Sequence, residues 1–111
     1  MITITLFHYL AISVILFSLG IYGLASKRNA VRMLMSVELI LNAANINLIA
    51  FTAYLFPDNF VGWTFTLFII SLAAAEVAIG LGIFLSLYQI YGTANLDDVK
   101  KIRERIEEGA K

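Results

Sequence analysis

The sequence contains no cysteine, only one histidine and one proline, and only 14% of its 111 residues are charged. Without cysteine the chain can form no disulfide, thiolate metal site or cysteine-ligated iron-sulfur cluster. His8 has no second ligand at helical spacing, so it is read as a plain interfacial histidine and no metal site is expected. The sequence contains no nucleotide-binding loop or catalytic triad. We therefore expect no catalytic or cofactor-binding residues, and no enzymatic activity from this chain alone.

Apolar residues dominate what is present, at 60% of the composition. A bilayer core of roughly 30 Å needs about 20 apolar residues in a helix, and three segments satisfy this requirement. They run from Thr5 to Ala25, from Val31 to Phe56 and from Phe60 to Tyr91. The only proline, Pro57, lies between the second and third segments, where a tight turn must join them. The predicted fold is an all-α membrane protein with three transmembrane helices.

The net charge is zero, but the charges are distributed unevenly along the chain. With three spans, the loop after the first span and the C-terminal tail lie on one side of the membrane. Every basic residue falls on that side: Lys27, Arg28, Arg32, Lys100, Lys101, Arg103, Arg105 and Lys111. By the positive-inside rule we expect this side, with the C-terminus, to face the cytoplasm and the N-terminus to lie outside.

The tail after the third span has the pattern of a short amphipathic helix. Asn95 is a suitable N-cap, and we expect the helix to end at Gly109. Its apolar residues recur at steps of three and four: Leu96, Val99, Ile102 and Ile106. Charge pairs are expected at i,i+4 from Asp97 to Lys101 and from Lys100 to Glu104. We divide the chain into a transmembrane domain, 1–91, and a cytoplasmic-side tail, 92–111, which either docks on a partner or membrane surface or is simply solvated.

Two glutamates, Glu38 and Glu76, lie inside the second and third spans. An acidic residue at a helix centre costs roughly 2.5 to 3.5 kcal/mol on insertion scales, whereas each large apolar residue returns about 0.3 to 0.6 kcal/mol. The cost is met by a protein partner, by water or by proton uptake. Intramembrane acids at similar depth are therefore candidates for proton transfer, with interhelical hydrogen bonding as the structural alternative.

The surroundings of the two glutamates differ. Asn42 and Asn45 fall within roughly 40° of Glu38 around its helix, so Glu38 begins a polar stripe, and Asn47 falls on the opposite side. Glu76 has only apolar neighbours on its own face. A row of small residues occupies nearly the opposite face of that helix: Ala74, Ala78 and Gly82. If this row packs within the chain, Glu76 turns toward another subunit; if it packs outward, Glu76 faces Glu38.

Two runs of sequence resemble a known family. GIYGLASKRNAVRMLMSVELILNAANINLIAF, residues 20–51, and FTLFIISLAAAEVAIGLGIFLSLY, residues 65–88, resemble subunit K of NADH-quinone oxidoreductase, the small three-helix membrane subunit of complex I and its photosynthetic and archaeal relatives. The resemblance implies a proton relay through Glu38 and Glu76, supported by Asn42, Asn45 and the basic residues Lys27 and Arg28. It also implies that quinone, flavin and iron-sulfur sites belong to partner subunits, and that this chain binds no cofactor.

The expected partners are other membrane-arm subunits, including antiporter-like ones, and the lipid bilayer, with no nucleic acid. The expected location is an energy-transducing membrane, a prokaryotic plasma membrane or a thylakoid in preference to another organelle. The alternatives are the C-type subunit of a multisubunit sodium/proton antiporter, which resembles the same three-helix fold, a small multidrug transporter, which needs four spans, and a purely structural assembly factor.

Overall fold

The computed structural model describes residues 3–111, and this part of the chain forms four α-helices and no strands. Their bounds are α1 Leu6–Ser26, α2 Ala30–Leu55, α3 Phe60–Tyr91 and α4 Leu96–Gly109. The first three are each long and apolar enough to cross a membrane. The predicted fold class, three transmembrane helices and a short C-terminal helix, is confirmed.

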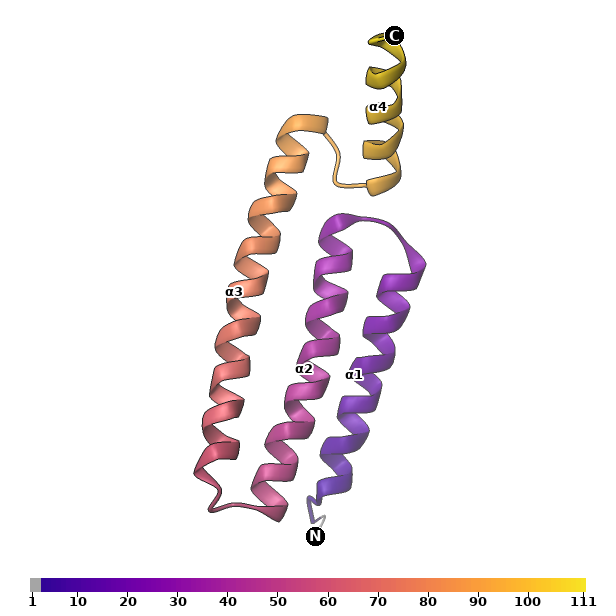
Figure 1. Cartoon of the computed structure of the whole chain (residues 1–111). Helices are drawn as coiled ribbons and strands as arrows, with labels where there is room; N and C mark the ends of the chain where they lie inside the picture. Colours follow the sequence, from indigo (N-terminus) through magenta and orange to yellow (C-terminus); the bar gives the residue numbers. More distant parts are fainter. Residues whose placement is uncertain (1–2) are drawn as a thin grey trace.

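The three long helices run side by side, with α2 between α1 and α3 (Figure 1). The N-terminus and the turn between α2 and α3 lie at one end of the bundle. The loop between α1 and α2 lies at the other end, from which α4 projects (Figure 1). The loop and tail that carry the basic residues therefore share one end, as the charge distribution predicts.

Small residues bring α1 and α2 into close contact. A Cβ atom added at Gly20 would lie 2.6 Å from Cγ1 of Ile40 and 2.8 Å from the backbone oxygen of Ser36. Gly23 is also buried against the Ser36 side chain. Glycine lets helix backbones approach closely in a membrane, where packing rather than the hydrophobic effect drives association.

The antiparallel helices α2 and α3 pair in the same register at two distant contacts. Gly62 of α3 contacts the side chain of Thr52, and Gly80 contacts the side chain of Leu34. The same number of residues separates Leu34 from Thr52 on α2 as separates Gly62 from Gly80 on α3. Opposing positions can therefore be assigned between these two contacts: each step forward from Leu34 corresponds to one step back from Gly80.

The row of small residues on α3 packs outward. Ala74 and Ala78 are exposed on the isolated chain, and a Cβ atom at Gly82 would have no neighbour within 4 Å. The sequence coupled an outward row to a Glu76 that faces Glu38. The structure has the outward row, but the side chain of Glu76 is exposed as well, so neither of the two arrangements is found as stated. Lipid or another protein must therefore cover it.

Asparagine caps begin three of the helices. Asn29 accepts hydrogen bonds from the backbone N–H groups of the first turn of α2, Asn59 accepts one from Gly62, and Asn95 accepts one from Asp97 at 3.0 Å. The predicted cap at Asn95 is thus confirmed. Such caps satisfy N–H groups that have no partner within the helix.

The tail is attached to the loop between α1 and α2 through the backbone. The N–H of Ala30 donates to the carbonyl of Ala94, and the N–H of Leu96 donates to the carbonyl of Arg28, both at 2.8 Å. Arg28 also forms an exposed ion pair with Asp97 at 3.6 Å. Neither predicted i,i+4 pair forms in residues 3–111: Asp97 pairs with Arg28 across the loop in place of Lys101, and no ion pair joins Lys100 to Glu104. The other ion pair joins Arg103 to Glu107.

Candidate functional site

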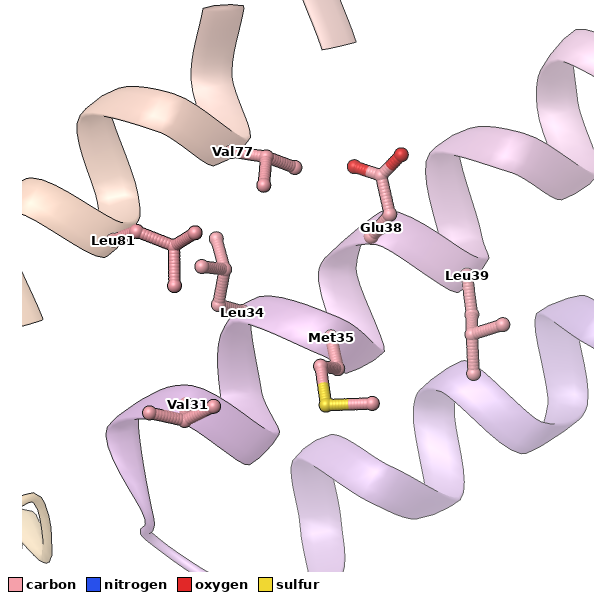
Figure 2. Close-up of a pocket in the computed structure, with 7 residues that line it drawn as sticks. All are labelled: Val31, Leu34, Met35, Glu38, Leu39, Val77 and Leu81. Carbon is pink, nitrogen blue, oxygen red and sulfur yellow. The ribbon is translucent and has the colours of Figure 1, made fainter. Parts of the chain in front are cut away.

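Glu38 lies on α2 and is half-buried in a groove between α2 and α3. Figure 2 shows its carboxyl group extending from α2 on the side of Val77, a residue of α3. The groove encloses about 410 Å³ and is lined by Val31, Leu34, Met35, Glu38, Leu39, Val77 and Leu81. All of its lining side chains except that of Glu38 are apolar. Burial of a carboxyl group among apolar side chains costs free energy unless it has a hydrogen-bond partner. A polar group or a water molecule that enters the groove would supply one.

Glu76 lies at the same level as Glu38 across the antiparallel helix pair. Four residues forward from Leu34 is Glu38, and four residues back from Gly80 is Glu76. Glu76 lines a small pocket together with Leu41 of α2, so it lies at the edge of the α2–α3 interface. No hydrogen bond joins the two carboxyl groups in the part of the chain described. The side chain of Glu76 is exposed on the isolated chain.

The two asparagines predicted to support Glu38 occupy different surroundings. Asn42 is exposed and donates from Nδ2 to Oε1 of Glu38 at 3.3 Å, one helical turn away. Asn45 is buried, and its Oδ1 atom has no hydrogen-bond partner among the described residues. The predicted stripe therefore exists in space, but only Asn42 contacts the carboxyl group directly.

Lys27 and Arg28 lie in the exposed loop at the basic end of the bundle. From Ala30, where α2 begins after Arg28, to Glu38 is eight residues of helix, or about 12 Å of rise. The structure does not bring these basic side chains to the carboxyl groups. Any effect they have on Glu38 acts through the electric field or through the position of the loop.

Two buried threonines were missed by the sequence analysis. Thr52 of α2 and Thr66 of α3 are 6% and 4% exposed. Thr52 contacts Gly62, one turn before Thr66, so both lie in the α2–α3 interface. The spacing of Glu38, Asn45 and Thr52 at intervals of seven residues was visible in the sequence and could have identified the first of them.

Among residues 3–111 no three histidine, cysteine, aspartate or glutamate side chains gather in a group that could hold a metal ion. The polar groups that α2 and α3 carry between their ends are instead the two carboxyl groups, amides and hydroxyls. These groups can exchange or orient protons and water.

Comparison with known proteins gives a consistent result. The family model described as NADH-ubiquinone/plastoquinone oxidoreductase chain 4L matches residues 8–104. A NAD(P)H-quinone oxidoreductase subunit 4L of Leptolyngbya boryana is 47% identical over 96 residues, which cover 86% of this chain and 95% of that protein. A NADH-quinone oxidoreductase subunit K of Brevibacillus brevis is 46% identical over 101 residues, covering 91% of this chain and 98% of that protein. A chromatophore subunit 4L of Paulinella chromatophora is 48% identical over 101 residues, covering 91% and 98%.

Proposed function

Since the chain belongs to the chain 4L family of NADH-quinone oxidoreductases, whose members are also named subunit K, we propose that it relays protons through Glu38 and Glu76. It is a membrane subunit of a complex I-like quinone oxidoreductase. The family and the relatives described above do not support the antiporter alternative. The multidrug-transporter alternative needs a fourth span, and the structure has three candidate spans in residues 3–111.

The observation that carries this proposal is the position of the two carboxyl groups. Glu38 points into the α2–α3 groove beside Val77, and Glu76, at the same level, borders the same interface from α3. A proton can leave one carboxyl group and reach the other through intervening water with little movement along the membrane normal. Asn42 supports the relay by orienting Glu38 through its hydrogen bond.

The exposure of Glu76 supports an assembly with other subunits. A carboxyl group facing lipid is costly, so intramembrane acids almost always face protein or a water-filled cavity. In this chain Glu76 and the outward row of Ala74, Ala78 and Gly82 lie on the uncovered surface of α3. Other membrane-arm subunits, including antiporter-like ones, would cover α3, and protons would pass between Glu76 and polar groups of those subunits. Quinone, flavin and iron-sulfur clusters belong to partner subunits in this proposal.

We assign the basic end of the bundle to the cytoplasmic side by the positive-inside rule. The N-terminus and the Pro57 turn then lie outside, and the tail of residues 92–111 forms a cytoplasmic-side extension of the transmembrane domain. Lys27 and Arg28 fix this orientation and contribute a positive field at the end of α2 nearest to Glu38. The membrane is energy-transducing, either a prokaryotic plasma membrane or a thylakoid.

The test uses the assembled complex reconstituted in vesicles. Glu38→Gln and Glu76→Gln remove one carboxyl group each with little change in volume. We expect each to lower proton pumping several-fold per electron transferred to quinone, while subunit content stays that of the wild type. Unchanged pumping in both variants would contradict the relay and support a purely structural role.

A further inference from the structure

Buried polar side chains continue along the α2–α3 interface from Glu38 toward the Pro57 turn. Glu38, Asn45 and Thr52 follow one another at steps of seven residues, which on an α-helix return to within about 20° of the same direction. Glu38 lines the groove against α3, and Thr52 contacts Gly62 of α3. Asn45, which is 9% exposed, therefore also faces α3.

Thr66 adds a hydroxyl from the opposite helix. It follows Gly62 by one turn, so in the antiparallel register it lies opposite Leu48, one turn before Thr52. This level falls between Asn45 and Thr52. The hydroxyl of Thr66 donates to the carbonyl of Gly62 at 2.9 Å, and its oxygen remains free to accept.

The unpartnered oxygen of Asn45 points to bound water. Buried polar atoms nearly always have a hydrogen-bond partner, and where no protein group supplies one, ordered water usually does. A pocket of about 50 Å³ beside Glu76 reaches Ile69, which lies opposite Asn45 in the register, although Asn45 itself does not line this pocket. A water molecule occupies about 30 Å³ in the liquid, so this space suits about one. The remaining lining residues of this pocket are Leu41, Leu72 and Ala73.

We infer that Asn45, Thr66 and Thr52 form, with bound water, a proton path inside this chain from the level of the two carboxyl groups to the Pro57 end of the bundle. The inference rests on the proposed relay and gives it one route out of the membrane centre. Rises of about 10 Å separate successive polar side chains of α2, so proton transfer needs two or three waters at about 2.8 Å spacing in each interval, more than the one that the pocket beside Glu76 holds.

Each step of this path transfers one proton. The O–H bond of a carboxylic acid at Glu38 or Glu76 breaks, a carboxylate remains, and the neighbouring water gains the proton and passes on one of its own. The hydroxyl of Thr66 keeps its proton in the hydrogen bond to Gly62, so its oxygen accepts a hydrogen bond from water and positions it without transferring the proton. The amide of Asn45 carries no proton itself; its Oδ1 accepts a hydrogen bond and positions the water. Asn45 is thus a positioning residue.

The chain supplies a matched control in Asn47. Its Oδ1 is also buried without a partner in residues 3–111, but Asn47 lines a different pocket, against Ser13 and Phe17 of α1. Removal of a buried amide costs packing and solvation at both positions. Only the loss of a water position between α2 and α3 is specific to Asn45.

The experiment measures protons pumped per electron transferred in vesicles that contain the assembled complex. The variants are Asn45→Leu, Asn45→Asp, Thr66→Val, Thr66→Ser and the control Asn47→Leu, beside Glu38→Gln. We expect Asn45→Leu and Thr66→Val to lose pumping to the level of Glu38→Gln while quinone reduction continues. Asn45→Asp and Thr66→Ser keep an oxygen in place and should retain most of the proton pumping. Asn47→Leu should pump as the wild type does.

The path is overturned if Asn45→Leu and Thr66→Val pump like Asn47→Leu. If Glu38→Gln loses pumping in the same experiment, the relay stands and only this route is wrong; if Glu38→Gln also pumps normally, the relay itself fails. If the complex with Asn45→Leu does not assemble, the comparison of proton pumping between Thr66→Val and Thr66→Ser tests the path by itself. Equal pumping in that pair contradicts the path, and a loss confined to valine supports it.

Discussion

Asn42 donates a hydrogen bond of 3.3 Å to the carboxyl group of Glu38, one turn earlier on α2. The two residues are at i,i+4, so the contact needs no other helix to bring them together. Asn42 is exposed and Glu38 is half-buried against apolar side chains of α3. This pair therefore lies where the polar stripe of α2 meets the apolar groove.

Replacing Asn42 by alanine should weaken the relay without abolishing it. A hydrogen bond within a protein contributes about 0.5–1.5 kcal/mol, and the exposure of Asn42 reduces its contribution here. We expect proton pumping in Asn42→Ala to fall between that of the wild type and that of Glu38→Gln, and Asn42→Gln, which keeps the amide, to recover most of it. The measurement is pumping per electron in vesicles. Wild-type pumping in Asn42→Ala would show that the hydrogen bond has no part in the relay.

The contact between α1 and α2 gives a stability prediction. Alanine at Gly20 would place its Cβ 2.6 Å from Ile40 and 2.8 Å from the backbone oxygen of Ser36, so the helices must separate. Overpacking of this kind costs about 1–3 kcal/mol. Gly82→Ala is the control, because its Cβ meets nothing within 4 Å in the chain. Thermal unfolding of the full chain in detergent, followed by circular dichroism, should show a lower midpoint for Gly20→Ala only; equal midpoints would contradict the packing.

Helix ends were predictable because local chemistry marks them. Three of the four helices begin after asparagine caps, at residues 29, 59 and 95, and the sequence analysis predicted the last of these. The joint between α2 and α3 falls at the only proline, as the sequence indicated. The direction of Glu76 was not predictable, because α3 is apolar on both faces and its pattern does not show which face meets α2. The contacts of Gly62 and Gly80 with α2 determine that face.

Ion pairing in the tail depended on a contact between distant parts of the chain. Asp97 and Lys101 have a suitable spacing for a pair on one helix, but the backbone pairing of Ala30 with Ala94 brings Arg28 close to Asp97. The polar row through Asn45 was predictable only in part. Periodicity identified Asn45, whereas the contribution of Thr66 from α3 requires the register between the two helices.

The attachment of α4 should depend on Gly92 more than on the ion pair. Gly92 ends α3 with a φ of 71°, a left-handed conformation that costs other residues about 1–2 kcal/mol. Arg28 and Asp97 are both largely exposed, and exposed pairs contribute about 0–1 kcal/mol. We expect Gly92→Ala to speed protease cleavage of residues 92–111 and Asp97→Asn to leave the rate nearly unchanged. Faster cleavage in Asp97→Asn but not in Gly92→Ala would contradict the prediction and show that the ion pair matters more than Gly92.

The absence of cysteine allows a direct test of the orientation. Lys111→Cys places a thiol at the end of the tail, and Asp58→Cys places one in the turn between α2 and α3, at the opposite end of the bundle. A membrane-impermeant maleimide added to sealed vesicles with the cytoplasmic face outward should label Lys111→Cys and leave Asp58→Cys unlabelled. Vesicles of the opposite orientation should give the reverse result. Labelling is read from the mass of this chain, so thiols of partner subunits do not interfere. Because all eight basic residues fall in the loop, the first turns of α2 and the tail, labelling of Asp58→Cys from the cytoplasmic face would mean that the charge distribution does not determine the orientation of this chain.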